Sequence, residues 1–419
     1  MISIRHVAVA SATAAALMGP ASRPALAQTT AAAQSPVPAP IQAGFQDGFF
    51  VQSADGNNRL NFGMVAQTDG RFDTDAVNPI TNTFTLRKIR PSLNGRVARY
   101  FDFKVTPDFG GGTTVIQDAY FDIRFSPKFR VRIGKDKTPI GYELLETDAY
   151  LLFPERSLAS SLIPNRDIGV QVQGDLSSKV FYAAGLLNGV PDGASTTTEL
   201  DTNNAKDLAG RIVVQPFRSS QVSASPLNGL GLALGGSHGN ESGALPSFKT
   251  SIQQTYFSYA TTATASGEHH RVTPALFYYY KSFGGFAEYA TSSQAVAKAG
   301  VGTRVVNDGW DVTTSFLVTG DTASYGLVRP KNAFDPANHH WGALQLLARV
   351  SRLTVDADAF SSGLTAAGAS RQATQATAGA NWYLSQFVKI YGTYERTAFD
   401  AASGRATEHT VLFRTQLAF

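Results

Sequence analysis

Hydrophobic and polar residues alternate along most of this 419-residue chain. Between Gly44 and Phe419 the alternating segments are roughly 9 to 13 residues long, and about 16 to 18 of them are separated by turn-forming residues. Because successive side chains of a strand point to opposite faces, each segment predicts a β-strand with one apolar face. Repetition of this pattern predicts an all-β, antiparallel barrel with an even number of strands. Representative segments are Lys179–Leu187, Lys206–Phe217, Ile252–Thr262, Arg271–Lys281, Gly342–Val350, Thr374–Leu384 and Phe387–Phe399.

The last ten residues indicate what surrounds the barrel. Val411, Phe413, Thr415, Leu417 and Phe419 share one face of the predicted closing strand, and the residues between them are mostly polar. In an exported chain this pattern favours a transmembrane barrel, with apolar side chains toward lipid and polar ones toward a water-filled lumen. The terminal phenylalanine resembles the tag that barrel assembly machinery recognises, so this machinery is an expected partner.

The first residues predict export. Arg5 and His6 precede the apolar stretch Val7–Leu17, and Ala25-Leu26-Ala27 fits a small-x-small cleavage site. We therefore expect residues 1–27 to be a signal peptide, with an alanine-rich disordered leader as the alternative. Residues 28–43, rich in Ala, Gln, Pro and Ser, predict a flexible periplasmic extension, or else a binding or trimer-organising arm. The barrel is expected from residue 44 to 419, in the outer membrane of a Gram-negative cell.

The composition agrees with a barrel wall and excludes several chemistries. Only 16% of the residues are charged, against about 25% in an average soluble domain. The absence of cysteine excludes a disulfide framework and a cysteine-based metal site. Without the signal peptide, 34 basic and 32 acidic residues remain, a net charge of +2. The whole chain is not a polycation, and no nucleic-acid partner is expected.

Positive charge is concentrated on one part of the predicted wall. Residues 85–140 contain twelve Lys or Arg and five Asp, a surplus of seven. A charge on the lipid face would cost about 2 to 4 kcal/mol near the bilayer midplane, so these cations are expected inside. Arg87 has the opposite parity, which predicts a rim or a subunit contact. We predict that the pore is lined, and anions are bound, by Lys88, Arg90, Arg96, Lys104, Arg124, Arg130, Arg132, Lys135, Lys137, Arg156 and Arg166.

One alternative to this prediction is that each cation simply pairs with a lumen Asp on a neighbouring strand. Five acids cannot neutralise twelve bases, however, so pairing leaves a surplus of positive charge.

The segment Thr138–Arg166 has no sustained alternation and is too long for a turn. Its apolar and aromatic residues predict a loop folded into the barrel that narrows the passage, with a surface loop as the alternative.

Several short motifs are found along the chain. They are Asp47-Gly48-Phe49, Leu86-Arg87-Lys88-Ile89-Arg90, Asp118-Ala119-Tyr120, the run from Arg132 to Glu143, Pro154-Glu155-Arg156-Ser157, the run from Asn165 to Val170, Asn381-Trp382-Tyr383 and the run from Tyr394 to Thr397. Together these motifs resemble those of the phosphate-selective porins O and P. The resemblance implies a barrel of 16 strands, a homotrimer in outer-membrane lipid, and a ladder of arginines and lysines that leads to a central anion site. This family has an Arg-Arg pair where the chain has Arg87-Lys88.

The sequence gives little support for a catalytic site or a metal site. The pairs His269-His270 and His339-His340 are adjacent residues, which point apart on a strand. No Gly-x-Ser-x-Gly elbow is present. We therefore expect no enzyme, cofactor or metal, but a porin for passive diffusion of small anions, phosphate or related oxyanions first. The alternatives are a general, organic-acid or sugar porin, and a structural or adhesive barrel with a plugged lumen.

Overall fold

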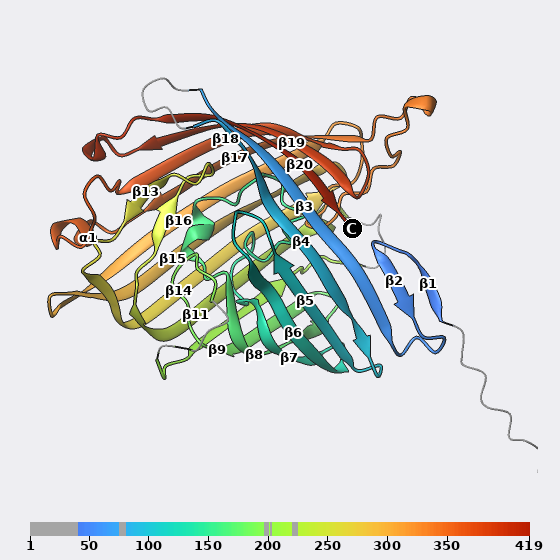
Figure 1. Cartoon of the computed structure of the whole chain (residues 1–419), viewed down its shortest axis with the longest axis horizontal. Helices are drawn as coiled ribbons and strands as arrows, with labels where there is room; N and C mark the ends of the chain where they lie inside the picture. The colour runs from blue at the N-terminus through green and yellow to red at the C-terminus, as the bar shows by residue number, and fades with distance from the viewer. Residues whose placement is uncertain (1–40, 75–80, 197–200, 202, 220–224) are drawn as a thin grey trace, which may run out of the picture. The chain divides into compact units, whose positions relative to one another are not determined.

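The chain forms a closed antiparallel β-barrel (Figure 1). The structure is a computed structural model and describes residues 41–74, 81–196, 201, 203–219 and 225–419. The predicted signal peptide and residues 28–40 of the predicted extension lie outside this range.

Each barrel strand pairs with the next, and β20 pairs with β3 to close the sheet, with Arg414 opposite Asp69. Without the hairpin β1–β2, the 18-stranded sheet contains the sixteen strands of the barrel. They are β3 (Arg59–Asp73), β4 (Thr83–Val97), β5 (Phe101–Asp108), β6 (Val115–Ser126), β7 (Phe129–Lys137), β8 (Arg166–Ser177), β9 (Val180–Leu187), β10 (Asp207–Val214), β11 (Leu230–Gly243), β14 (Ala263–Tyr280), β15 (Phe283–Lys298), β16 (Val301–Leu317), β17 (Ala343–Thr354), β18 (Gln372–Tyr383), β19 (Val388–Phe399) and β20 (Glu408–Ala418).

The first described residues form a hairpin of β1 (Gln42–Phe45) and β2 (Phe49–Gln52), which extends the start of β3. The first strand of the closed barrel therefore begins at Arg59, later than the expected boundary at residue 44. The ring centroids of Phe45 and Phe49 lie 6.2 and 5.8 Å from that of Phe419. Aromatic contacts thus connect this hairpin to the end of the closing strand.

The barrel turns an apolar face outward and a polar face inward, as the alternation predicts. In β20, Val411, Phe413 and Leu417 are exposed on the outer face, whereas Arg414 and Gln416 are buried on the inner face. Outward exposure of large apolar side chains is expected where lipid replaces water. The same exposure is seen at Phe84, Phe101, Phe121, Phe125, Leu208, Leu232, Leu276, Val312, Phe316 and Leu346.

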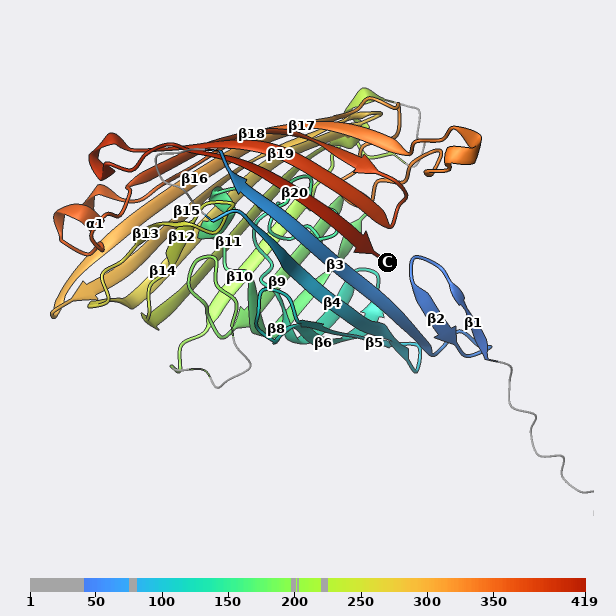
Figure 2. The same cartoon turned by 45° about the horizontal axis from the view of Figure 1, so that its top comes forward.

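The two ends of the barrel differ in their connections (Figure 2). At one end the strands are joined by short turns, such as residues 98–100, 127–128 and 281–282. At the other end the connections are longer, including residues 188–206 and 355–371. There are three exceptions: the connections of residues 215–229 and 318–342 are long and lie at the short-turn end, and the two-residue turn 299–300 lies at the other end.

Two long connections fold into the barrel. Residues 138–165, named here the constriction loop, contain the short helix η1 (Ala159–Leu162) and bury Ile140, Leu158 and Ile163 completely or nearly so. These side chains pack in one apolar cluster with Leu187 and Ala290 of the barrel wall. The prediction of an inward-folded loop is confirmed.

The second inward connection was expected to be a wall strand. The segment Ile252–Thr262 contains only β13 (Thr255–Ser258), which pairs with β12 (Ser247–Lys249) in a separate hairpin. Adjacent residues Tyr256 and Phe257 are both buried, which a strand with one lipid face does not allow. That strand prediction is wrong, because both side chains pack with the constriction loop in the apolar cluster.

Helices are few and short in the described part of the chain, and none is long and apolar enough to cross a membrane. Besides η1 they are η2 (Pro226–Gly229), η3 (Pro336–Asn338), α1 (Ala357–Ser361) and η4 (Ala401–Ser403).

Candidate functional site

The inner face of β3 to β8, named here the basic wall, borders two hollows in the barrel. Their volumes are about 440 and 680 Å³, and both are lined by Asn94, Lys104 and Arg132. The hollows are therefore neighbours along the same wall. Seven of the eleven predicted residues line one or both: Arg90, Arg96, Lys104, Arg130, Arg132, Lys137 and Arg166.

The cations of the basic wall share carboxylates between neighbouring strands. Asp118 accepts hydrogen bonds from Lys104 at 2.9 Å and from Arg166 at 2.8 Å. The alternative that a cation pairs with an Asp on a neighbouring strand therefore holds for these individual residues. One carboxylate serves two cations, however, so a positive surplus remains on the wall. The same sharing is seen at Asp102 with Arg96 (2.9 Å) and Arg124 (3.3 Å), and at Asp122 with Arg132 (2.7 Å) and Arg130 (3.8 Å).

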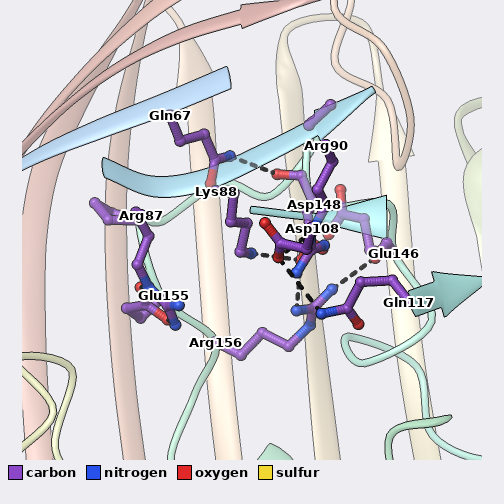
Figure 3. Close-up of polar contacts among 12 residues, drawn as sticks. Gln67, Arg87, Lys88, Arg90, Asp108, Gln117, Glu146, Asp148, Glu155 and Arg156 are labelled. Carbon is purple, nitrogen blue, oxygen red and sulfur yellow. Dashed lines mark hydrogen bonds and ion pairs between the residues drawn. The ribbon is translucent and has the colours of Figure 1, made fainter. Parts of the chain in front are cut away.

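Three cations converge on one carboxylate of the constriction loop (Figure 3). Asp148 Oδ1 lies 2.8 Å from Lys88 Nζ and 2.7 Å from Arg156 Nη1, and Asp148 Oδ2 accepts a hydrogen bond from Arg90. Arg90 also contacts Asp108 at 2.6 Å. We name Lys88, Arg90 and Arg156 the cation cradle. It joins two residues of β4 to one of the loop, which positions the loop against the basic wall.

Asp148 lies in the loop, outside the strands, and is ionised within the cation cradle. Burial disfavours the charged carboxylate, but Lys88, Arg156 and Arg90 outweigh burial and hold the pKa of Asp148 well below its usual range. The cradle is therefore arranged to stabilise a buried anion with charge-assisted hydrogen bonds.

Arg87 faces the lumen, and its predicted position at a rim or subunit contact is wrong. In the pairing of β3 with β4, Gln67 lies opposite Lys88 and Thr68 opposite Leu86, so Arg87 has no partner in the register. This β-bulge inserts one extra residue and reverses the expected parity locally. Arg87 Nε and Nη2 donate to Glu155 of the constriction loop at 2.7 and 3.0 Å.

Lys135 is separate from the other predicted cations. Its Nζ donates to the carbonyl oxygen of Thr196 at 2.6 Å, and it lines neither hollow. It shares the parity of Ile133 on β7, which differs from that of Arg132. Its place in the pore lining therefore stays a prediction. Two residues later the strand ends, and Lys137 reaches the carbonyl oxygens of Leu144 and Glu146 in the constriction loop.

Side chains from the far wall fix the constriction loop in place. Glu288 of β15 accepts the backbone N–H groups of Tyr142 at 2.7 Å and Glu143 at 3.0 Å. Glu143 lies 3.3 Å from Arg349 of β17. Asn381 and Lys389 donate to loop carbonyl oxygens at 2.8 Å each. The loop is thus held from both sides of the barrel, which fixes the cradle geometry.

Several residues of the site carry no recognisable signal in the sequence. Asp148 and Glu155 carry no local motif that marks them as partners of distant strands. Arg414 lies on the polar face of the closing strand, so its inward position was readable, but its partners Asp69 and Glu155 were not. Within the described residues, no group of three or more His, Cys, Asp or Glu could hold a metal ion.

Comparisons with known proteins give a family and a fold. A family model described as phosphate-selective porin O and P matches residues 59–419. The search of curated proteins found no match. Among solved structures, an anion-selective porin from Comamonas acidovorans is 12% identical with a TM-score of 0.53, covering 86% of this chain and 99% of that porin.

Two further solved structures share the barrel. OmpT of Vibrio cholerae with loop L8 deleted is 12% identical, with a TM-score of 0.52 and coverage of 87% of this chain and 100% of that one. Salmonella typhi OmpF in complex with daunomycin is 10% identical, with a TM-score of 0.51 and coverage of 90% and 100%. At these identities the likeness establishes the fold alone.

Proposed function

The chain belongs to the phosphate-selective porin O and P family, and on that premise we propose that small anions, phosphate or related oxyanions first, diffuse through it along the basic wall. It is an outer-membrane porin of a Gram-negative cell and a channel rather than an enzyme. The end with short turns is then the periplasmic end, and the end with long connections faces outward.

The observation that carries the anion proposal is the coordination of Asp148. A carboxylate and a phosphate both present anionic oxygens that accept charge-assisted hydrogen bonds at about 2.7 to 2.9 Å. Lys88 and Arg156 hold one oxygen of Asp148 at 2.8 and 2.7 Å, and Arg90 donates to the other. A phosphate that reaches the cradle competes with Asp148 for the same donors, so the resident carboxylate limits how tightly the free anion binds.

The basic wall supplies the approach to the cradle. Its cations outnumber the carboxylates that they share, and a surplus of one sign in a narrow lumen lowers the barrier for ions of the opposite sign. Arg96, Lys104 and Arg130 have more than a third of their side-chain surface exposed. An anion can exchange between them without displacing a deeply buried pair.

The test is the reversal potential of the purified channel in a planar bilayer under a tenfold KCl gradient. An anion pore gives a potential close to the equilibrium potential of chloride. A potential near that of potassium would contradict the proposal, and the absence of ion flux would favour the plugged barrel.

We also propose that the chain assembles as a homotrimer and that barrel assembly machinery uses Phe419. Phe419→Ala should lower the amount of folded protein in the outer membrane, whereas Thr415→Ala on the same outer face should not. Chemical crosslinking of the protein in native membranes should give a species of three chains. Equal levels of the two variants would contradict the role of Phe419, and a monomer alone would contradict the trimer.

A further inference from the structure

Arg211 of β10 differs from the cations of the cradle. It faces the lumen, yet it makes no hydrogen bond or ion pair with any residue that the structure describes, and its Nε is buried. By contrast, Lys88, Arg90 and Arg156 all contact Asp148. Arg211 is half-buried with its Nε unsatisfied, and the carboxylate of Glu288 acts on it only through space, so its donors remain available for an anion from outside the chain.

The surroundings of Arg211 indicate the class of that anion. Its guanidinium borders a cavity of about 540 Å³ with aromatic walls, named here the aromatic cavity. The Cζ atom of Arg211 lies 5.2 Å from the ring centroid of Phe181. The other aromatic side chains of the wall are Tyr142, Phe277, Tyr279 and Tyr325.

The aromatic wall is built from four separate segments, one of which is β9 with Phe181. Tyr142 of the constriction loop stacks on Phe277 of β14, with centroids 4.8 Å apart. Tyr325, from the long connection at the short-turn end, lies 4.7 Å from Tyr142 and donates to its carbonyl oxygen at 2.8 Å. These contacts brace the wall before any ligand arrives. The cavity therefore requires little reorganisation on binding.

Arg211 also lines the 440 Å³ hollow beside the basic wall. The aromatic cavity is thus adjacent to the proposed anion path and reachable from it. Its volume falls within the range of about 300 to 1,000 Å³ that is usual for small-molecule sites. Polar side chains also line the cavity, among them Gln215, Arg218 and Asn228, and the five aromatic rings favour an anion that carries an apolar ring over a phosphate.

We propose that the aromatic cavity binds monocarboxylates that carry an aromatic ring, with benzoate as the simplest example. The carboxylate accepts two parallel hydrogen bonds from the Arg211 guanidinium. The ring stacks against Phe181 and the tyrosines, where offset and edge contacts are favourable. This proposal does not depend on phosphate selectivity, because neither Arg211 nor the aromatic wall belongs to the cation cradle.

The test is calorimetric titration of the detergent-solubilised porin with benzoate, and with acetate as a carboxylate that lacks a ring. Wild-type protein should bind benzoate at least about tenfold more tightly than acetate, because the ring buries apolar surface. Arg211→Gln should weaken benzoate binding at least about tenfold. Arg304→Gln, which removes a cation from the outer face, should leave benzoate binding unchanged.

A second variant separates the ring from the charge. Phe181→Leu should weaken benzoate binding and leave acetate binding unchanged, and it decides the question if Arg211→Gln does not fold. The proposal is overturned if the wild type binds benzoate no better than acetate, or if both variants bind benzoate like the wild type. Anion selectivity of the channel is measured separately, so a failure here is distinguishable from a failure of the proposed pore.

Discussion

The basic wall and the opposite wall of the barrel use charge in different ways. On the basic wall, Arg96 and Arg130 are each 37% exposed and border open hollows. On the opposite wall, Arg271 of β14 and Arg349 of β17 are fully buried among loop residues. A lumen cation therefore serves permeation only where a passing anion can take the place of its counter-ion.

Energetics support this distinction. An exposed ion pair contributes only about 0 to 1 kcal/mol, so a passing anion can replace its carboxylate. Removing one partner of a buried pair leaves an uncompensated charge and costs roughly 3 to 5 kcal/mol. Buried pairs of the opposite wall therefore hold the loops, whereas exposed pairs of the basic wall exchange with the solute. In the buried cradle, a phosphate has to take the place of Asp148 so that the three cations stay compensated.

The largest expected effect is on stability. Arg271 contacts Asp192 at 2.6 Å, Glu241 at 2.9 Å and Asp207 at 3.5 Å. Arg271→Ala would leave these three carboxylates buried without their guanidinium, and should lower the free energy of unfolding by roughly 3 to 5 kcal/mol. Arg130→Ala should lower it by less than about 1 kcal/mol. Urea unfolding of the two variants in lipid vesicles measures both free energies of unfolding. If the two variants lose equal stability, the proposed difference between the two walls is wrong.

The next effect is on selectivity. Arg130→Gln combined with Arg132→Gln removes two cations and leaves Asp122 without both partners. The reversal potential should move from the chloride value toward zero while the protein still inserts. Val131→Asp, which puts a charge on the outer face, is the matched comparison and should impair insertion. Normal insertion of Val131→Asp, with failure of the double variant, would show that the faces are inverted.

A smaller effect is expected within the cradle. Asp148→Asn removes the resident charge and leaves Lys88, Arg90 and Arg156 for the free anion. The phosphate concentration that halves the chloride current should fall about tenfold, equivalent to about 1.4 kcal/mol. Asp335→Asn, on the exposed 318–342 connection, removes the same charge elsewhere and should leave that concentration unchanged. A weaker phosphate effect in Asp148→Asn would mean that Asp148 does not compete with the anion.

Strand parity predicted a large part of the fold and the inner face. It placed Arg90, Arg96 and Arg132 correctly because those stretches of β4 and β7 are regular. It failed at Arg87, where a bulge adds one residue and nothing in the local sequence marks it. Parity gave no support for the predicted place of Lys135 in the pore lining, because Lys135 shares the parity of Ile133.

The partners of the site were beyond the reach of the sequence. Asp148 and Lys88 are 60 positions apart and meet only because the loop folds across the lumen. Tyr256 and Phe257 look like strand residues, but the loop buries both. The inward position of Arg211 follows from the alternation of β10. Whether Arg211 finds a hydrogen-bond partner depends on where the loops and the other strands place their acceptors, and this cannot be read from β10 alone. Alternation is read from neighbouring residues, whereas these contacts join segments that are far apart in the sequence.

The most direct test of the account is the effect of phosphate on chloride current through the purified channel. We predict that millimolar phosphate reduces the chloride current, because an anion held in the cradle must leave before the next one passes. Lys88→Ala should weaken this block, since it removes one of the three cradle cations. A channel that is anion-selective, but whose chloride current does not respond to phosphate at any concentration, would contradict the account and would be a general anion porin.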